Sequence, residues 1–213
     1  MIFYFFFLSS HVALSSFSSV DGAGVLIGIG TVALAGIWAL FRFRRRSSDV
    51  SLWQRPLDLL VVVGFTQFSV IAILVDAVQA GAGWGPITSS YGPSLLADAF
   101  AEWVKSCDPL LGANPLWYWF LAVLSPLLYT PLYVVGILAF LERRMSNAVR
   151  NLILMWGALI SATTILIILE EFYGSHPSPN RLQMLGGYVP YVIFPLFVVW
   201  RVWNPDVFPT IKA

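Results

Sequence analysis

The sequence predicts an all-α integral membrane protein: a bundle of five transmembrane helices with an interfacial helix on its lumenal side. The first observation is composition, because 58% of the 213 residues are hydrophobic and only 11% are charged, whereas soluble domains carry about 25% charged residues. The second is the recurrence of apolar runs of the length that crosses a hydrocarbon core, about 20 residues per helix. One core cannot enclose this much apolar surface, so much of it faces lipid.

The five apolar runs follow one another along most of the chain. They cover residues 23–41, 57–80, 116–141, 151–170 and 188–203. Ten of the twelve Lys and Arg residues fall on one side of the predicted membrane, and only Lys105 and Arg181 fall on the other. Because the positive side is cytosolic, the N-terminus is expected in the lumen and the C-terminus in the cytosol.

These runs divide the chain into four parts. An N-terminal lumenal segment, residues 1–22, precedes an extra first transmembrane helix with its basic flank, residues 23–46. A four-helix membrane domain covers residues 52–205, and a cytosolic tail covers residues 206–213. Segment 1–22 is open between an interfacial segment and a removed signal peptide, because it is apolar but has no basic start.

The loop between the second and third runs, residues 81–115, contains a further helical pattern. Pro93 and Ser94 provide a helix start, and the apolar residues that follow fall on one face, at Leu95, Leu96, Ala99, Phe100, Trp103 and Val104. This pattern predicts an amphipathic helix in the lumenal interface. A lid helix that packs only on protein is an equal alternative.

Several classes of site are not indicated. A net charge of +1 provides no basic field for nucleic acid. The single cysteine, Cys107, excludes an internal disulfide, and without His or Cys clusters we expect no metal. Ser125 has no His or Lys nearby, which argues against a serine nucleophile, and the Gly24-x-x-x-Gly28 pattern indicates close helix packing rather than nucleotide binding.

Three acids lie within or at the end of apolar runs, where an ionised carboxylate is costly unless it faces a partner, a cavity or water. They are Asp76, Glu170 and Glu171. All three fall near the lumenal ends of their helices, so they can share one depth and act as the catalytic acids. Adjacent residues diverge by about 100° on a helix, and we expect Glu170 to face inward. A hydrogen-bonded cluster that only joins helices is the alternative.

Prolines interrupt the third and fifth runs, at Pro126, Pro131, Pro190 and Pro195. Each frees a backbone carbonyl, which membranes tolerate where neighbours or a cavity satisfy it. Polar and aromatic residues accompany these breaks, and we expect them to line a ligand pocket around Asp76. The ligand-binding candidates are Gln67, Ser125, Tyr129, Thr163, Tyr188, Tyr191 and Trp117.

Three short motifs, taken in order, resemble a known family. Arg55-Pro56-Leu57-Asp58-Leu59-Leu60 is followed by Asp76, and Lys105 precedes Asp108-Pro109-Leu110-Leu111; Tyr188-Val189-Pro190-Tyr191 is followed by Pro195. This order is similar to the EXPERA family, the superfamily of the emopamil-binding protein and the sigma-two receptor, and is closest to the sigma-two type. The resemblance covers residues 52–205, and the extra helix is similar to the five-span sterol-isomerase branch.

The resemblance implies an intramembrane pocket for a sterol-like ligand or a lipophilic amine, with Asp76 at the family's ligand-binding aspartate. It also implies residence in the endoplasmic reticulum membrane, which suits modest span lengths. The isomerase branch has a His and two Glu where this chain has Gln67, Ile71 and Ala122. The sigma-two type pairs its aspartate with a Glu, and Ser125 stands at that position. Asp76 with Glu170 or Glu171 would have to supply the acids.

Two functions remain. The first is a cofactor-independent isomerase or cyclase of a sterol or terpenoid, in which one acid donates a proton, another group removes one, and aromatic rings stabilise a carbocation. The second is a non-catalytic receptor for a sterol or lipophilic amine, or a regulator of lipid trafficking. Transport ranks third because no inverted repeat is visible. The expected partners are that small molecule and membrane lipid, with no nucleic acid, and a homodimer is left open.

Overall fold

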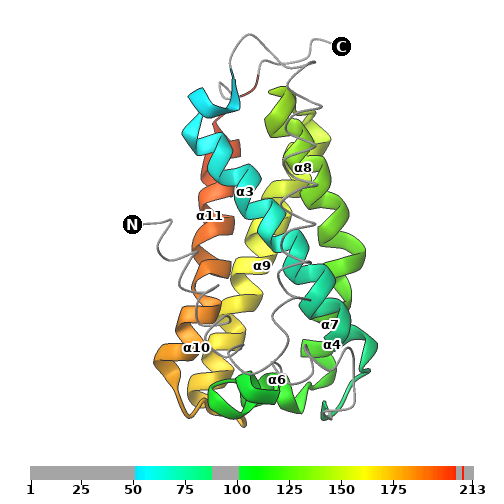
Figure 1. Cartoon of the computed structure of the whole chain (residues 1–213), viewed down its shortest axis with the longest axis vertical. Helices are drawn as coiled ribbons and strands as arrows, with labels where there is room; N and C mark the ends of the chain where they lie inside the picture. The colour runs from blue at the N-terminus through cyan, green and yellow to red at the C-terminus, as the bar shows by residue number, and fades with distance from the viewer. Residues whose placement is uncertain (1–50, 88–100, 205–207, 209–213) are drawn as a thin grey trace, which may run out of the picture.

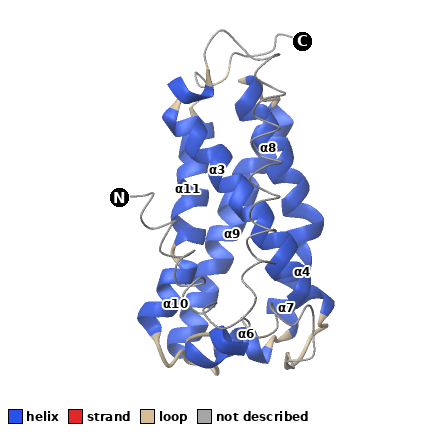
Figure 2. Cartoon of the chain, in the orientation of Figure 1, coloured by secondary structure: helices blue, strands red, loops and turns tan. Residues whose placement is uncertain are grey.

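The computed structural model describes residues 51–87, 101–204 and 208, and all the regular secondary structure in them is helical. No strand occurs within those residues, as Figure 2 shows. The predicted segment 1–22 and first span 23–41 lie outside the described residues, as does the start of the predicted interfacial helix. Residues 101–106 of that helix are described and are helical.

Four helical stretches make up the bundle. The first contains η1 (Leu52–Gln54), α3 (Pro56–Ile71), η2 (Ala72–Asp76) and α4 (Ala77–Gly81). The second contains α6 (Pro109–Ala113), α7 (Leu116–Leu124), η3 (Ser125–Tyr129) and α8 (Thr130–Glu142). The third is α9 (Asn147–Tyr173), and the fourth contains α10 (Arg181–Tyr188) and α11 (Pro190–Trp203).

Three of these stretches are long and apolar enough to cross a membrane. They are Leu116–Glu142, Asn147–Tyr173 and Arg181–Trp203, and each includes one of the last three predicted runs. The predicted run 57–80 corresponds to α3, η2 and α4, which continue one another from Pro56 to Gly81. At 1.5 Å per residue that stretch is about 39 Å long. The protein is therefore a membrane-embedded helical bundle.

The helices pack in two main pairs, α9 with α11 and α3 with α8. Glycines allow this close approach, because a Cβ at Gly157 of α9 would lie 3.2 Å from the backbone oxygen of Pro195. Figure 1 shows that α3 begins at the end of the bundle where α11 finishes, whereas α6 and α10 lie at the other end. We call these the Asp58 end and the Asp108 end, after a buried acid in each.

Local signals set where the helices begin and end. Ser146 caps α9 by accepting a hydrogen bond from the Val149 amide at 3.3 Å, and Asn180 caps α10 in the same way. α8 ends at Arg143, whose φ of 54° lies in the left-handed region. These ends hold α8, α9 and α10 in the lengths that bring their polar residues to the two ends of the bundle.

Aromatic side chains fill the centre of the bundle. Phe65 lies 5.5 Å from Tyr133 and 5.3 Å from Trp156 between ring centroids. Phe68 stacks on Tyr191 at 4.7 Å. The Trp156 Nε1–H donates to the Tyr133 hydroxyl at 3.2 Å, so the cluster satisfies one of its own polar groups. This aromatic cluster, Phe65, Phe68, Tyr133, Trp156 and Tyr191, joins the helices in the middle of the bundle.

Candidate functional site

Asp76 is the last residue of η2, one of two π-helical turns in the bundle's described residues. The other is η3, which begins at Ser125. The two turns contact each other, and the Ser125 hydroxyl lies within hydrogen-bonding reach of the Asp76 carboxyl group. Single π turns inside α-helices are rare and occur frequently at functional sites. The structure therefore brings together the two residues that the resemblance placed at the family's acid pair.

The π turn at η3 has a local cause in the sequence. Pro126 lacks the amide that would continue regular α-helical bonding, and the Thr130 amide bonds back to the Ser125 carbonyl oxygen, five residues earlier. The Thr130 hydroxyl also donates to that oxygen at 3.2 Å. Both lone pairs of the Ser125 carbonyl are thus used inside its own helix, which leaves the Ser125 side chain free to face Asp76.

Asp76 has aromatic rather than basic surroundings. The phenols of Tyr118, Tyr133 and Tyr191 all lie close enough to interact with its charge. Among the described residues, no Lys, Arg or His forms an ion pair with Asp76. The acid therefore faces the aromatic cluster without a counter-charge from the described part of the protein.

A second polar centre lies at the Asp108 end. The fully buried Asp108 carboxylate accepts hydrogen bonds from Trp103 Nε1 at 2.9 Å, from the Leu111 amide at 2.8 Å and from the Tyr188 hydroxyl at 2.5 Å. The Tyr188 hydroxyl is in turn 2.7 Å from the Tyr118 hydroxyl. Asp108 entered the sequence-based predictions only as part of a motif, although its place before Pro109 already marks it as a helix N-cap.

Of the two adjacent glutamates, Glu171 is the buried one. It is 0% exposed, and its Oε1 accepts from the Leu110 amide at 3.1 Å. Its carboxyl group lies close to Asp108, and its Oε2 makes no hydrogen bond. Glu170 is 30% exposed and binds the Ser175 amide at 2.8 Å and His176 at 3.4 Å.

The expectation that Glu170 faces inward is therefore wrong. The buried positions of α9 include Ile160, Thr164 and Ile167, and the next position on that stripe is residue 171. Extending the apolar periodicity to the end of the helix would have identified Glu171 from the sequence. Whether either glutamate takes part in catalysis remains a prediction.

The other expected ligand-binding residues have varied surroundings. Tyr191 lies in the aromatic cluster beside Asp76, and Tyr129 is buried with its hydroxyl unbonded. Gln67 is half-buried on α3. The Thr163 hydroxyl bonds to its own helix at Leu159 and Ile160, and the adjacent Thr164 is the buried one of the two. Trp117 is 39% exposed.

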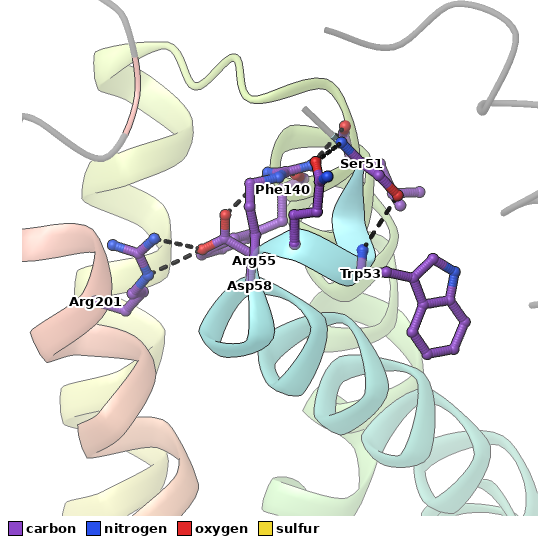
Figure 3. A network of polar contacts seen from close by, with 8 residues as sticks. Ser51, Trp53, Arg55, Asp58, Phe140 and Arg201 are labelled. Atoms are coloured by element: carbon purple, nitrogen blue, oxygen red, sulfur yellow. Dashed lines mark hydrogen bonds and ion pairs between the residues drawn. The ribbon is translucent and has the colours of Figure 1, made fainter. Parts of the chain in front are cut away.

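The Asp58 end holds an ion-pair network that sequence analysis did not predict (Figure 3). Asp58, only 2% exposed, accepts from Arg55 Nη1 at 2.9 Å and from Arg201 Nε at 2.9 Å. Arg55 also donates to the Phe140 carbonyl at 3.0 Å, at the end of α8. The network joins α3, α8 and α11 at this end of the bundle.

Neither thiol nor metal chemistry has a site in the described residues. Burial raises the pKa of the Cys107 thiol to about 12, and the neighbouring Asp108 and Glu171 charges add to that shift. The thiol is therefore protonated and inert at neutral pH. No three His, Cys, Asp or Glu residues of the described chain are grouped so that they would hold a metal ion.

Comparison with known proteins gives one match. The sequence model described as EBP: EXPERA (EXPanded EBP superfamily) matches residues 95–202, about half of the chain. The matched range includes Asp108, Ser125, Glu171 and Tyr188, whereas Asp76 precedes it. No curated protein and no solved structure matches the chain.

Proposed function

The chain belongs to the EXPERA family, and on that basis we propose that it binds a sterol- or terpenoid-like ligand inside the membrane, beside Asp76. The observation that carries the proposal is the pair of π turns, η2 and η3, which turn Asp76 and Ser125 toward each other in an apolar bundle. A half-buried acid in an apolar helix, with no cation paired to it among the described residues, has a ligand as its natural partner.

We further propose that the protein isomerises or cyclises this ligand by acid–base chemistry. An acid in an apolar site can keep its proton at neutral pH and deliver it to a carbon–carbon double bond. The carbocation that results would lie against the rings of Tyr133, Trp156 and Tyr191, whose faces attract positive charge. One proton is added and one is removed, and the substrate keeps its overall oxidation state, so the proposed reaction needs no redox cofactor.

A receptor without catalysis is the second candidate, and a specific observation favours it. Ser125 stands where the sigma-two type has a second acid, so the described site offers one carboxylate without a cation. A lipophilic amine, protonated at neutral pH, would supply that cation. In this function Asp76 pairs with the ligand and transfers no proton.

The two functions separate in one experiment. Membranes that contain the protein are incubated with a panel of sterols and terpenoids carrying isomerisable double bonds, and the products are identified by gas chromatography and mass spectrometry. Binding is followed with a photoreactive diazirine sterol and with a radiolabelled lipophilic tertiary amine. Asp76→Asn keeps the shape of the side chain and removes the acid, and Glu142→Gln at an exposed position of α8 is the matched control.

For the enzyme we expect Asp76→Asn to lower turnover at least about 100-fold, the usual effect of losing a general acid, with sterol photolabelling retained. For the receptor we expect amine affinity to fall by about 1–3 kcal/mol, the scale of a charge-assisted contact, with no product from any variant. Glu142→Gln should behave as wild type. An Asp76→Asn protein with unchanged turnover and unchanged binding would place the ligand elsewhere.

The location and orientation belong to the same proposal. The basic asymmetry of the loops supports a cytosolic Asp58 end and a lumenal Asp108 end, and membership of the EXPERA family supports residence in the endoplasmic reticulum membrane. A glycosylation acceptor engineered near Ser89 should then be modified, and one engineered between α8 and α9, at residues 143–146, should not. Modification of the second acceptor alone would reverse the orientation.

A further inference from the structure

A hydrogen-bonded chain runs from the neighbourhood of Asp76 to Asp108. The Tyr118 phenol interacts with the charges of both acids, and its hydroxyl is 2.7 Å from that of Tyr188. The Tyr188 hydroxyl is within 2.5 Å of Asp108 Oδ2. Tyr118 belongs to α7, which packs against η2, the turn that carries Asp76, so two hydroxyl groups lead from the helix beside the proposed ligand site to the Asp108 carboxylate.

The direction of the protons in this chain follows from the number of donors. Asp108, as a carboxylate, can only accept, so the single hydroxyl proton of Tyr188 is donated to it. The Tyr118 hydroxyl must then donate its own proton to the Tyr188 oxygen. The Tyr118 oxygen keeps its lone pairs for whatever lies on the side of Asp76, and it is therefore arranged to accept a proton.

Both ends of the chain are buried, and Tyr188 between them is half-buried. Asp108 is 0% exposed and Tyr118 is 7% exposed. Trp103 Nε1 and the Leu111 amide occupy the other acceptor positions of Asp108, and Glu171 lies behind it with the Leu110 amide. A proton that reaches Asp108 has Tyr188 and Tyr118 as its hydrogen-bonded route back.

We propose that Asp108 is the terminal proton acceptor of the reaction at Asp76, reached through the hydroxyl groups of Tyr118 and Tyr188. This inference rests on the proposed isomerase or cyclase function. It replaces the expectation that Glu170 or Glu171 supplies the second acid–base group, and it makes Glu171 a residue that positions Leu110 and Asp108.

The proton steps balance within the protein. The Asp76 O–H bond breaks as the π electrons of the substrate form a C–H bond, which leaves a carbocation. A C–H bond next to that cation then breaks, its electron pair forms the new double bond, and its proton goes to the Tyr118 oxygen. At the same time the Tyr118 proton moves to Tyr188, and the Tyr188 proton moves to Asp108. After product release the reverse shift through the same hydroxyls returns one proton to Asp76.

Removing one hydroxyl at a time tests the chain. Tyr118→Phe and Tyr188→Phe in the full-length protein should each lower kcat at least about 100-fold, because general-base catalysis contributes about 10²–10⁴-fold. KM and labelling by the diazirine sterol should stay within about twofold of wild type, because this proposal gives both hydroxyls a role in proton transfer, and the Tyr188 hydroxyl, a ligand-binding candidate from the sequence, is engaged by Tyr118 and Asp108 instead. Tyr173→Phe, at a position 82% exposed near the end of α9, is the matched control and should change neither.

A structural role of these hydroxyls predicts a different pattern. If they only join helices, their loss would lower the unfolding temperature and the sterol labelling together with turnover. The solvent isotope effect adds an independent reading: in H2O–D2O mixtures wild-type kcat should depend on deuterium content along a curve, because several exchangeable protons move together. Should Tyr188→Phe fail to fold, Tyr118→Phe tests the same chain at its other end.

The possible outcomes test the proton relay separately from the proposed isomerase or cyclase function. A wild-type protein that converts none of the sterols or terpenoids overturns the reaction and the relay together. Wild-type turnover with unchanged kcat in both tyrosine variants overturns the relay alone. Wild-type turnover, reduced kcat and unchanged labelling in both variants would support it.

Discussion

Asp58 and Asp76 lie on one continuous helical stretch, from Pro56 to Gly81, and their surroundings are opposite. Asp58 is held between Arg55 and Arg201, with contacts of 2.9 Å and 2.6 Å. Asp76 faces Ser125 and three phenols, with no cation paired to it in the described residues. The protein neutralises Asp58 to join its helices and pairs Asp76 with no cation in the described residues, which is why Asp76 is the acid that we propose for the ligand site.

We expect the largest effect on stability from removing the carboxylate of Asp58, the acid that is neutralised. Asp58→Ala leaves two guanidinium groups without their shared carboxylate, which we expect to cost about 3 kcal/mol of unfolding free energy. This is the lower end of the range for buried pairs, because the Arg201 side chain is 19% exposed. Unfolding of the purified protein in a detergent series measures it, with Asp76→Asn as the control, expected below about 1 kcal/mol. Equal losses of unfolding free energy in the two variants would show that Asp58 and Asp76 do not differ in their contribution to stability.

At the Asp108 end, the adjacent residues Glu170 and Glu171 also differ in burial. Glu171→Ala leaves the buried Leu110 amide without its acceptor and should cost about 2 kcal/mol, within the penalty for a buried unsatisfied donor. Glu170→Ala removes a partly exposed contact to His176 and should cost less than about 1 kcal/mol. The same unfolding assay compares them. A larger loss for Glu170→Ala would contradict the buried position of Glu171.

Ser125 tests whether the proposed ligand site lies at Asp76. Ser125→Ala removes the only hydroxyl side chain that faces Asp76 from η3, and we expect the affinity for a lipophilic tertiary amine to fall about fivefold, or about 1 kcal/mol. Equilibrium binding of the radiolabelled amine measures the change. Ser175→Ala, at an exposed position just after α9, is the control and should bind as wild type. Equal affinities of the two variants for the amine would show that Ser125 does not contribute to the ligand site.

The smallest effect concerns the thiol beside the Asp108 centre. Its pKa is raised from 9.0 to about 12 in the folded protein, so unfolding releases protons above about pH 9. The stability from this group is full below pH 9 and is lost as the pH rises toward 12. At pH 8 we expect Cys107 to resist maleimide in the folded protein and to react after denaturation, as mass spectrometry would record. Rapid labelling of the folded protein would show that this end opens to water.

Much of the fold followed from local patterns. Hydropathy predicted the runs 116–141, 151–170 and 188–203, and the structure has apolar helices of membrane-spanning length over each. The order of short motifs predicted the EXPERA family, which the match over residues 95–202 confirms. Such features depend on which residues are neighbours in the chain, and the sequence contains that information completely.

Local sequence patterns did not predict correctly which of the two adjacent glutamates, Glu170 or Glu171, is buried. Both sit at the same helix end, and their composition and depth do not distinguish them. The rotation of α9 decides the matter, because its buried stripe through Ile160, Thr164 and Ile167 carries Glu171 into the bundle. That rotation is set by packing against α11 at Gly157, where the backbone of Pro195 approaches closely.

The sequence by itself determined the class of this protein and its apolar helices, and it pointed to Asp76 as the acid proposed for the ligand site. Only the tertiary structure decided which acids are neutralised and which are linked. Arg201 meets Asp58 across 143 residues, and Tyr188 meets Asp108 across 80. Hydrogen bonds and ion pairs act over a few ångströms, so partners far apart in the chain are chosen by helix packing and rotation.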